Sequence, residues 1–191
     1  RRMARQIIFT QSILVEKFED VELKKEILNE LKLSEESNNG RFFSNIGGFQ
    51  TQNIKNIKIL KLLVDKICKL MFEHYKINTR YIEISNLWIN KNNKGDFNDT
   101  HVHPNCHFSG VYYVSTSTKG GTLKFLNDDL KVFASLSRFI ENDSDFMETY
   151  VIKPEENLLI LFPSYLKHMV LPHYDEKARI SVSFNINLKD G

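Results

Sequence analysis

The chain has 191 residues, of which 41% are hydrophobic and 26% are charged. This composition is typical of a soluble globular domain. The formal net charge of +2 is too small to indicate nucleic acid or an anionic membrane as a partner. No apolar run approaches the roughly 20 residues that span a bilayer. The two cysteines form no disulfide framework, so we expect a reducing, cytoplasmic setting.

The first 80 residues or so have the periodicity of helices. Asp20 is placed to cap a helix whose apolar residues recur every three or four positions up to Leu31. Residues 34–48 are polar and contain glycine, which indicates a loop. Residues 57–71 carry a wide apolar stripe, so we predict a second and stronger helix there.

From Tyr81 onward the pattern changes to that of β-strands. We expect strands at residues 81–90, 108–115, 122–126, 148–153, 158–162 and 179–188. The polar stretch at residues 127–147 indicates a long surface excursion of the kind that often forms a lid. Helices beside many short strands predict an α+β protein, mainly β, with a barrel or sandwich core. We predict a single domain over residues 1–191, helical to about residue 80 and β from 81 to 188.

In the last predicted strand, residues 179–188, apolar and polar side chains alternate strictly. Alternate residues of a strand point to opposite faces, so the apolar side can pack on a layer of helices. The polar side begins with Arg179 and includes Ser181. This side either faces solvent or lines a hydrated cavity, and periodicity alone leaves both open.

Four of the six histidines lie in two short segments, residues 101–107 and 162–168. His101 and His103 stand at i and i+2 of an extended segment, so both imidazoles can reach one ion. His168 follows an apolar strand and a Phe-Pro turn, and it can supply a third ligand. Three ligands leave coordination positions open, and imidazole suits Fe(II), Zn, Cu and Ni. We predict a metal site of these three residues, although a lone His-x-His also occurs in ordinary surface histidines.

Five motifs, in this order and spacing, resemble those of the Fe(II)/2-oxoglutarate-dependent dioxygenases. The similarity is greatest to a 2OG-Fe(II) oxygenase branch found in bacteria and phages. The motifs are LWIN at 87–90, HVHP at 101–104, SGVYYV at 109–114, LFPSYLKH at 161–168 and RISVSFN at 179–185. The resemblance covers about residues 81–188, with a helical N-terminal extension.

The resemblance implies a double-stranded β-helix, a jelly-roll and cupin-like barrel braced by the N-terminal helices. It implies that His101 and His168 bind Fe(II), and it puts His103 where most members have a carboxylate. Three neutral imidazoles would leave the full charge of the ion in place, which affects both the redox tuning and the choice of metal. A nearby carboxylate, Asp96 or Asp99, is the alternative third ligand.

The resemblance also implies a binding site for 2-oxoglutarate. Arg179 takes the place of the arginine that pairs with the distal carboxylate. A guanidinium suits this role because it binds a carboxylate in fork geometry. Ser181 matches the hydroxyl two residues beyond that arginine. Tyr113 matches a tyrosine that holds the same carboxylate in prolyl-hydroxylase-like members, and Asn90 is a candidate for the other end of the co-substrate.

The implied activity is that of an oxygenase that uses Fe(II), 2-oxoglutarate and O2, most simply a hydroxylase that couples decarboxylation of 2-oxoglutarate to oxidation of a substrate. The alternatives are a three-histidine cupin-like metal-binding protein or dioxygenase that does not use 2-oxoglutarate, and a catalytically silent interaction domain. The substrate is a small molecule or a peptide, and residues 34–48 and 127–147 are expected to select it. The oligomeric state is open, with a homodimer among the options.

Five other residues attract attention. We expect Trp88 in the core rather than as a substrate platform, and His107 hydrogen-bonded outside the site. We do not expect Cys106 to be a metal ligand, and we expect His173 to be exposed. Asn157 stands at a turn where family members often have glycine, and it should keep the turn because asparagine tolerates the left-handed region.

Overall fold

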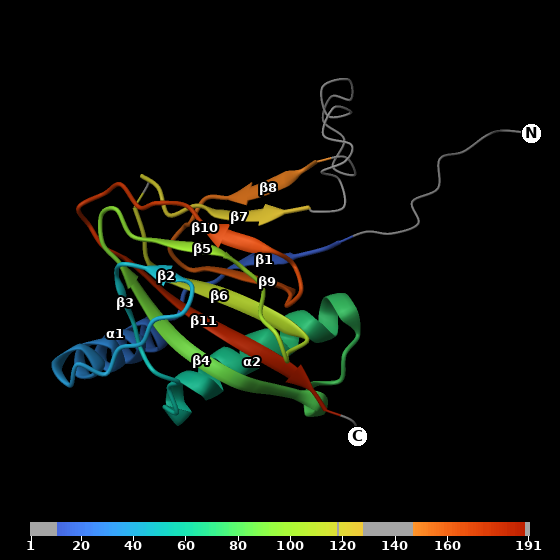
Figure 1. Ribbon diagram of the computed structural model, residues 1–191. Helices are drawn as coiled ribbons and strands as arrows, with labels where there is room; N and C mark the ends of the chain where they lie inside the picture. Colours follow the sequence, from blue (N-terminus) through green and yellow to red (C-terminus); the bar gives the residue numbers. More distant parts are fainter. Residues whose placement is uncertain (1–10, 118, 128–146, 190–191) are drawn as a thin grey trace, which may run out of the picture.

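The computed structural model describes residues 11–117, 119–127 and 147–189. Two antiparallel sheets face each other, and two helices cover the outer side of the larger sheet (Figure 1). No helix in these three ranges is long and apolar enough to cross a membrane. The mainly β, jelly-roll architecture predicted from the sequence is therefore confirmed. The expected lid at residues 127–147 lies almost entirely outside the described residues.

The larger sheet has six strands in the order β1-β9-β6-β11-β4-β3. Their bounds are β1 Leu14–Lys17, β9 Leu158–Pro163, β6 Phe108–Ser115, β11 Arg179–Leu188, β4 Ile82–Asn92 and β3 Phe49–Gln50. The smaller sheet has the order β2-β5-β10-β7-β8. Its strands are β2 Asn45–Ile46, β5 Phe97–His101, β10 His168–Val170, β7 Leu123–Leu126 and β8 Thr149–Ile152.

Both helices form where the sequence predicts them. Helix α1, Val21–Glu36, begins at Asp20, whose Oδ1 accepts a hydrogen bond from the backbone N–H of Leu23 at 2.9 Å. Helix α2, Ile57–Tyr75, is capped by Asn56 and is followed by the short 3-10 helix η1, Thr79–Tyr81. The two helices share one core with the larger sheet, which holds them against its outer face.

Strand β11 separates this core from the interior of the barrel. Val182, Phe184 and Ile186 are fully buried in the core that contains the helices, as the alternation predicts. The other face of β11 points toward the smaller sheet. On this face Ser181 is paired with Asn90 of the neighbouring strand β4, and both residues line the cavity. A second hydrophobic core lies between the two sheets and includes Val111, Phe125 and Phe162. The first half of the polar face of β11, Arg179, Ser181 and Ser183, therefore lines an interior cavity.

Asn157 adopts the left-handed conformation at the turn before β9, with φ of 71°. Its backbone N–H donates to the carbonyl of Tyr113 at 2.9 Å, and its own carbonyl accepts from Phe18. The prediction that asparagine keeps this turn is confirmed.

Candidate metal centre

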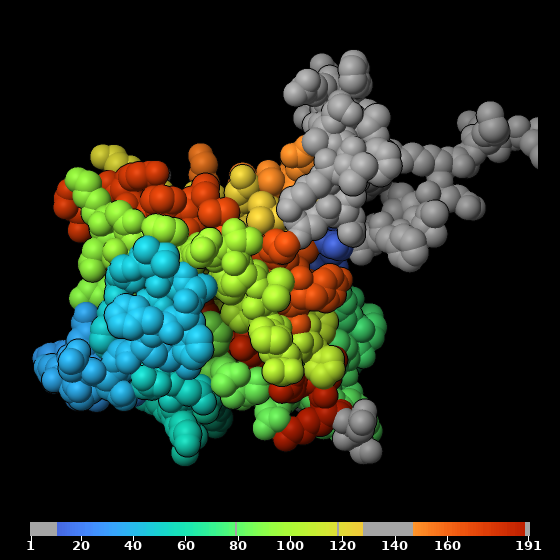
Figure 2. All heavy atoms as spheres, in the orientation of Figure 1, coloured from blue at the N-terminus to red at the C-terminus, as the bar shows by residue number. Residues whose placement is uncertain are grey.

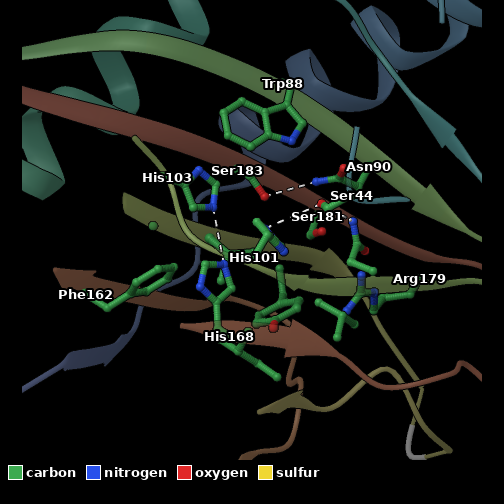
Figure 3. A pocket seen from close by; sticks show the side chains of 16 residues that line it. Ser44, Trp88, Asn90, His101, His103, Phe162, His168, Arg179, Ser181 and Ser183 are labelled. Carbon is green, nitrogen blue, oxygen red and sulfur yellow. Dashed lines mark hydrogen bonds between the residues drawn. The ribbon is translucent and has the colours of Figure 1, made fainter. Parts of the chain in front are cut away.

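His101, His103 and His168 lie together at one end of the interior cavity (Figure 3). His101 ends β5 and His168 begins β10, and the two residues are directly opposite each other in the antiparallel pair. His103 follows two residues after the end of β5. The nearest ligand atoms of the three side chains are all within 4.8 Å of one another. This arrangement can hold one ion.

Two backbone carbonyls orient two of the imidazoles. His101 Nδ1 donates to the carbonyl of Asp99 at 2.7 Å, and His168 Nδ1 donates to the carbonyl of Leu166 at 2.8 Å. In both cases the acceptor is two residues earlier in the chain. Because each Nδ1 carries the proton, each Nε2 keeps its lone pair for a metal. His103 Nε2 lies 3.2 Å from His168 Nε2, so the free nitrogens converge.

Burial keeps the three imidazoles neutral. Burial, together with a smaller contribution from the neighbouring His101, lowers the pKa of His168 to about 3 and that of His103 to about 4. The pKa of His101 is also lowered by burial. A neutral imidazole is the form that binds a metal, so near pH 7 no proton has to leave before an ion enters.

The two carboxylates considered as alternative ligands lie elsewhere. The Asp96 carboxylate packs against Gly47 and Gly48, and one of its oxygens accepts from the backbone N–H of Asn93 at 2.7 Å. Asp99 is exposed, and its side chain accepts from the next backbone N–H. Among the described residues, the group of possible ligands contains histidines alone.

Arg179 lies at another side of the same cavity (Figure 3) and is 2% exposed. Its Nη1 donates to the carbonyl of Gly121 at 2.9 Å, and its Nη2 donates to Asn92 Oδ1 at 2.7 Å. Its Nε has no partner within the described part of the chain. Burial lowers the pKa of this guanidinium, and the Tyr113 ring, 5.9 Å from Cζ, lies beside it.

This buried cation has no carboxylate partner among the described residues, which is unusual because an uncompensated buried charge is costly. Gly121 is needed close to it, since a Cβ there would come within 2.9 Å of Arg179 Cδ. The cavity therefore presents a fixed guanidinium toward whichever anion enters.

Three further polar residues of the cavity, Asn90, Ser181 and Ser183, come from alternate positions of β4 and β11. Asn90 Nδ2 donates to Ser183 Oγ at 3.0 Å, while Asn90 Oδ1 is buried without a partner among the described residues. Ser181 is 1% exposed and lines the cavity between Asn90 and Tyr113, its two cross-strand neighbours. All seven residues predicted for the site thus surround one cavity.

Sequence reasoning missed several residues of this site. Trp88 is buried, as expected, but it also lines the cavity and stacks on His103, with ring centroids 5.8 Å apart. Asn92 was not predicted as the partner of Arg179. A signal was present, because residues 88, 90 and 92 alternate along β4 opposite residues 183, 181 and 179 of β11. Ser44 and Asn98 reach the cavity from segments that have no periodic pattern.

Three other residues lie outside the cavity lining. His107 Nδ1 accepts from the backbone N–H of Leu188 at 3.1 Å, as predicted. Cys106 is a free thiol and does not belong to the group of three possible ligands. The expectation that His173 is exposed is wrong: it is 1% exposed and donates through Nε2 to the carbonyl of Lys177. Its backbone forms an isolated antiparallel bridge with Gly120, which connects the loop that contains His173 to the turn at Gly120.

A family model described as "Putative 2OG-Fe(II) oxygenase" matches residues 86–185, more than half of the chain. The chain belongs to this family. The matched region contains the three histidines together with Arg179 and Tyr113. No curated protein sequence matches the chain.

Several solved structures share the fold of this oxygenase. A prolyl-4-hydroxylase from Pseudomonas putida has 14% identity and a TM-score of 0.64, with 95% of each chain covered. HygX from Streptomyces hygroscopicus, crystallised with nickel and 2-oxoglutarate, has 12% identity and a TM-score of 0.65, covering 94% of this chain and 84% of that one. A viral collagen prolyl hydroxylase from Paramecium Bursaria Chlorella virus-1, in complex with 2-oxoglutarate, has 12% identity and a TM-score of 0.56, with coverage of 90% and 94%.

Proposed function

We propose that the protein is a hydroxylase that uses Fe(II) and 2-oxoglutarate, with the iron held by His101, His103 and His168. Family membership supports the reaction class, and the single observation that supports these residues is the convergence of three neutral imidazoles whose ligand atoms lie within 4.8 Å. Three facial ligands leave positions for a co-substrate and oxygen. The donor set therefore fits the iron of the family.

The opposite part of the cavity fits 2-oxoglutarate. We assign the distal carboxylate to Arg179, because this guanidinium is buried, fixed by two hydrogen bonds, and has no acceptor for Nε among the described residues. Tyr113 and Ser181 would donate their hydroxyls to the same carboxylate. The hydroxyl of Tyr113 is a donor at neutral pH, since burial raises its pKa.

Asn90 is proposed for the other end of the co-substrate. In its present orientation Nδ2 donates to Ser183, and the free Oδ1 cannot bind another acceptor. Rotation of the amide by half a turn lets Ser183 donate to Oδ1 and frees Nδ2 for a carboxylate oxygen. Both orientations satisfy Ser183, so this exchange costs little.

When bound, Fe(II) and 2-oxoglutarate would let O2 act as the oxidant: one oxygen atom would enter succinate as 2-oxoglutarate loses CO2, and the other would enter the substrate as a hydroxyl group. The chain's own residues provide binding and orientation. The carbonyls of Asp99 and Leu166 hold two imidazoles in position, and Trp88 and Phe162 cover the histidines with apolar surface that excludes water. The substrate is proposed to be a small molecule or a peptide, since structural neighbours include HygX with hygromycin B and a prolyl hydroxylase with a peptide fragment.

Two substitutions test the assignment. In anaerobic calorimetry we expect wild-type protein to bind one Fe(II) and then 2-oxoglutarate. His168→Ala should lose metal binding, whereas Arg179→Ala should keep the metal and lose 2-oxoglutarate by at least about tenfold, because a charge-assisted pair of hydrogen bonds is removed. His74→Ala, on the outer surface of α2, is the matched control and should change neither. Retention of full metal affinity by His168→Ala would contradict the metal site.

A three-histidine metal protein that does not use 2-oxoglutarate is the second candidate. The observation that favours it is His103, which occupies the place of the usual carboxylate and leaves the ion with its full charge. The same calorimetry separates the two functions. Metal binding without any 2-oxoglutarate binding to wild-type protein would support this candidate and reject the first.

A further inference from the structure

Arg41 is a cation with no anionic partner among the residues that the structure describes. Its guanidinium lies over two aromatic rings, with Cζ 4.7 Å from the centroid of Phe43 and 5.4 Å from that of Trp88. Nε is buried without a hydrogen-bond partner, and the described part of the chain offers the side chain no carboxylate or carbonyl. Burial alone lowers the pKa of Arg41. The guanidinium is thus partly desolvated and still has its full set of donors.

The position of Arg41 connects it to the metal centre. The Trp88 ring that contacts Arg41 also stacks on His103, with centroids 5.8 Å apart and planes inclined by 22°. Trp88 lines the cavity above the histidines (Figure 3). Two ring contacts therefore separate the guanidinium from a proposed iron ligand, a span that a small metabolite or a short peptide segment can cover.

Arg41 is outside the cavity lining and contacts it through Trp88, which lies away from the proposed 2-oxoglutarate site. Arg179 is opposite Asn92 on β4, whereas Trp88 is four residues earlier on the same strand, about 13 Å away at strand spacing. A 2-oxoglutarate molecule whose distal carboxylate is on Arg179 would leave Arg41 without an anion. Neither the described residues nor the co-substrate then supplies an anion for Arg41, so an acidic group of the substrate can occupy this place.

The backbone on both sides of Arg41 is fixed. The N–H of Arg41 donates to the carbonyl of Gln50 on β3 at 2.8 Å. Three residues later, the carbonyl of Ser44 accepts from the N–H of Asp99 at 2.8 Å, and Ser44 Oγ accepts from Asn98 Nδ2 at 3.2 Å. Figure 2 shows this light-blue segment at the surface beside the yellow-green one that carries β5. The backbone that carries Arg41 is therefore ordered before a ligand arrives, and the contacts with Phe43 and Trp88 place the guanidinium, which reduces the entropy lost on binding.

We propose that Arg41 determines substrate specificity by binding a carboxylate or phosphate group of the substrate. An apolar or planar part of the substrate lies on Trp88, which directs the reacting carbon toward the histidines. Phe43, which is 73% exposed and lies under the guanidinium, provides further apolar contact. This inference rests on the proposed function and adds to it the class of substrate, an acidic compound with an apolar portion.

Trp88 is the only tryptophan of the chain, so its fluorescence reports on this site. The protein is loaded with Ni(II) and saturating 2-oxoglutarate and is titrated with two anionic probes, 3-phenylpropionate and phenyl phosphate. The uncharged amide of 3-phenylpropionate and phenol are the matched neutral probes. We expect at least one anion to bind about tenfold to a hundredfold more tightly than its neutral partner, the factor that charge-assisted hydrogen bonds supply. The anion that binds more tightly shows whether Arg41 prefers a carboxylate or a phosphate group.

Arg41→Ala and Arg41→Gln should both remove this preference for the anion. Arg41→Gln keeps a hydrogen-bond donor and much of the side-chain length, so it covers the case in which Arg41→Ala does not fold. Arg80→Ala is the matched control, because Arg80 also lies over a ring, 4.6 Å from the centroid of Tyr81, but on the exposed η1. It should retain the preference.

Two results would overturn the proposal: equal binding of anionic and neutral probes by wild-type protein, or an unchanged preference in a folded Arg41 variant. Calorimetry of 2-oxoglutarate binding on the same samples separates this inference from the proposed function. If 2-oxoglutarate binds but the probes do not depend on Arg41, the specificity inference alone fails. If 2-oxoglutarate does not bind, the proposed function fails, and the titration with Ni(II) alone still decides the role of Arg41.

Discussion

Asn92 decides whether Arg179 is free to bind a carboxylate. Its neutral amide oxygen accepts one N–H of the guanidinium at 2.7 Å, which positions the cation without neutralising it. An aspartate in the same place would supply the missing counter-charge from within the protein. The choice of an amide at this buried position, 2% exposed, therefore keeps the positive charge available for a ligand.

Asn92→Asp should weaken 2-oxoglutarate binding by about tenfold or more, because a buried Asp–Arg pair competes with the ligand carboxylate. Asn92→Ala should weaken it less, since the guanidinium loses a positioning bond but keeps its charge. Calorimetric titration of the metal-loaded variants measures both effects. An affinity for 2-oxoglutarate in Asn92→Asp equal to that of wild-type protein would be inconsistent with Arg179 as the carboxylate partner.

At the scale of elements, the side chains of two neighbouring strands pack over Gly110 of β6. Gly110 is paired with Phe184 of β11 on one side and with Leu161 of β9 on the other. A Cβ at this position would lie 2.4 Å from the Phe184 ring, which is fully buried in the core beneath the helices. The glycine is thus required for the packing of Phe184 in the core that the larger sheet shares with the helices.

Gly110→Ala should lower the free energy of unfolding by about 1–3 kcal/mol, the usual cost of overpacking a core. Urea denaturation measures this change. Gly95→Ala is a useful comparison, although its φ of 92° adds backbone strain, because no atom lies within 4 Å of the added Cβ. If adding Phe184→Leu to Gly110→Ala restores part of the lost free energy of unfolding, the loss comes from the contact with the Phe184 ring. If it restores none, the loss has another origin.

At the scale of the whole molecule, the two sheets bury the three histidines and thereby link stability to pH. The pKa values of His168 and His103, about 3 and about 4, lie below the ordinary imidazole value of about 6.5. Between these values the unfolded chain binds more protons than the folded one. The free energy of unfolding is therefore not reduced by these histidines above pH 6.5, and it falls as the pH decreases from 6.5 toward 4.

Metal-free protein should accordingly unfold at lower urea concentration at pH 5 than at pH 7. His168→Asn, which removes one depressed pKa, should make this difference smaller, whereas His74→Ala should leave it unchanged. Saturating metal at pH 7 should raise the midpoint, because the ion binds the folded state. An equal midpoint at pH 5 and pH 7 in metal-free wild-type protein would contradict the burial of neutral imidazoles.

The features that the sequence by itself determined are those with a local physical cause. Asp20 and the apolar stripes specify both helices, and the alternation in residues 179–188 specifies a strand with one buried apolar face and one polar face. The His-x-His pair and the order of the motifs were enough to predict the family and its jelly-roll fold. These signals are local because helix and strand periods are properties of neighbouring residues.

Only the tertiary structure decided the features that depend on pairing between distant segments. Strands β2, β3 and β10 have two or three residues each, and the polar β5 has no apolar alternation, so their partners define them. The pairing of β5 with β10 brings His101 opposite His168 across 67 positions of sequence. Contacts between remote segments also bury His173 and place Arg41 against Trp88. The sequence could not predict them, because such contacts leave no periodic pattern in either segment.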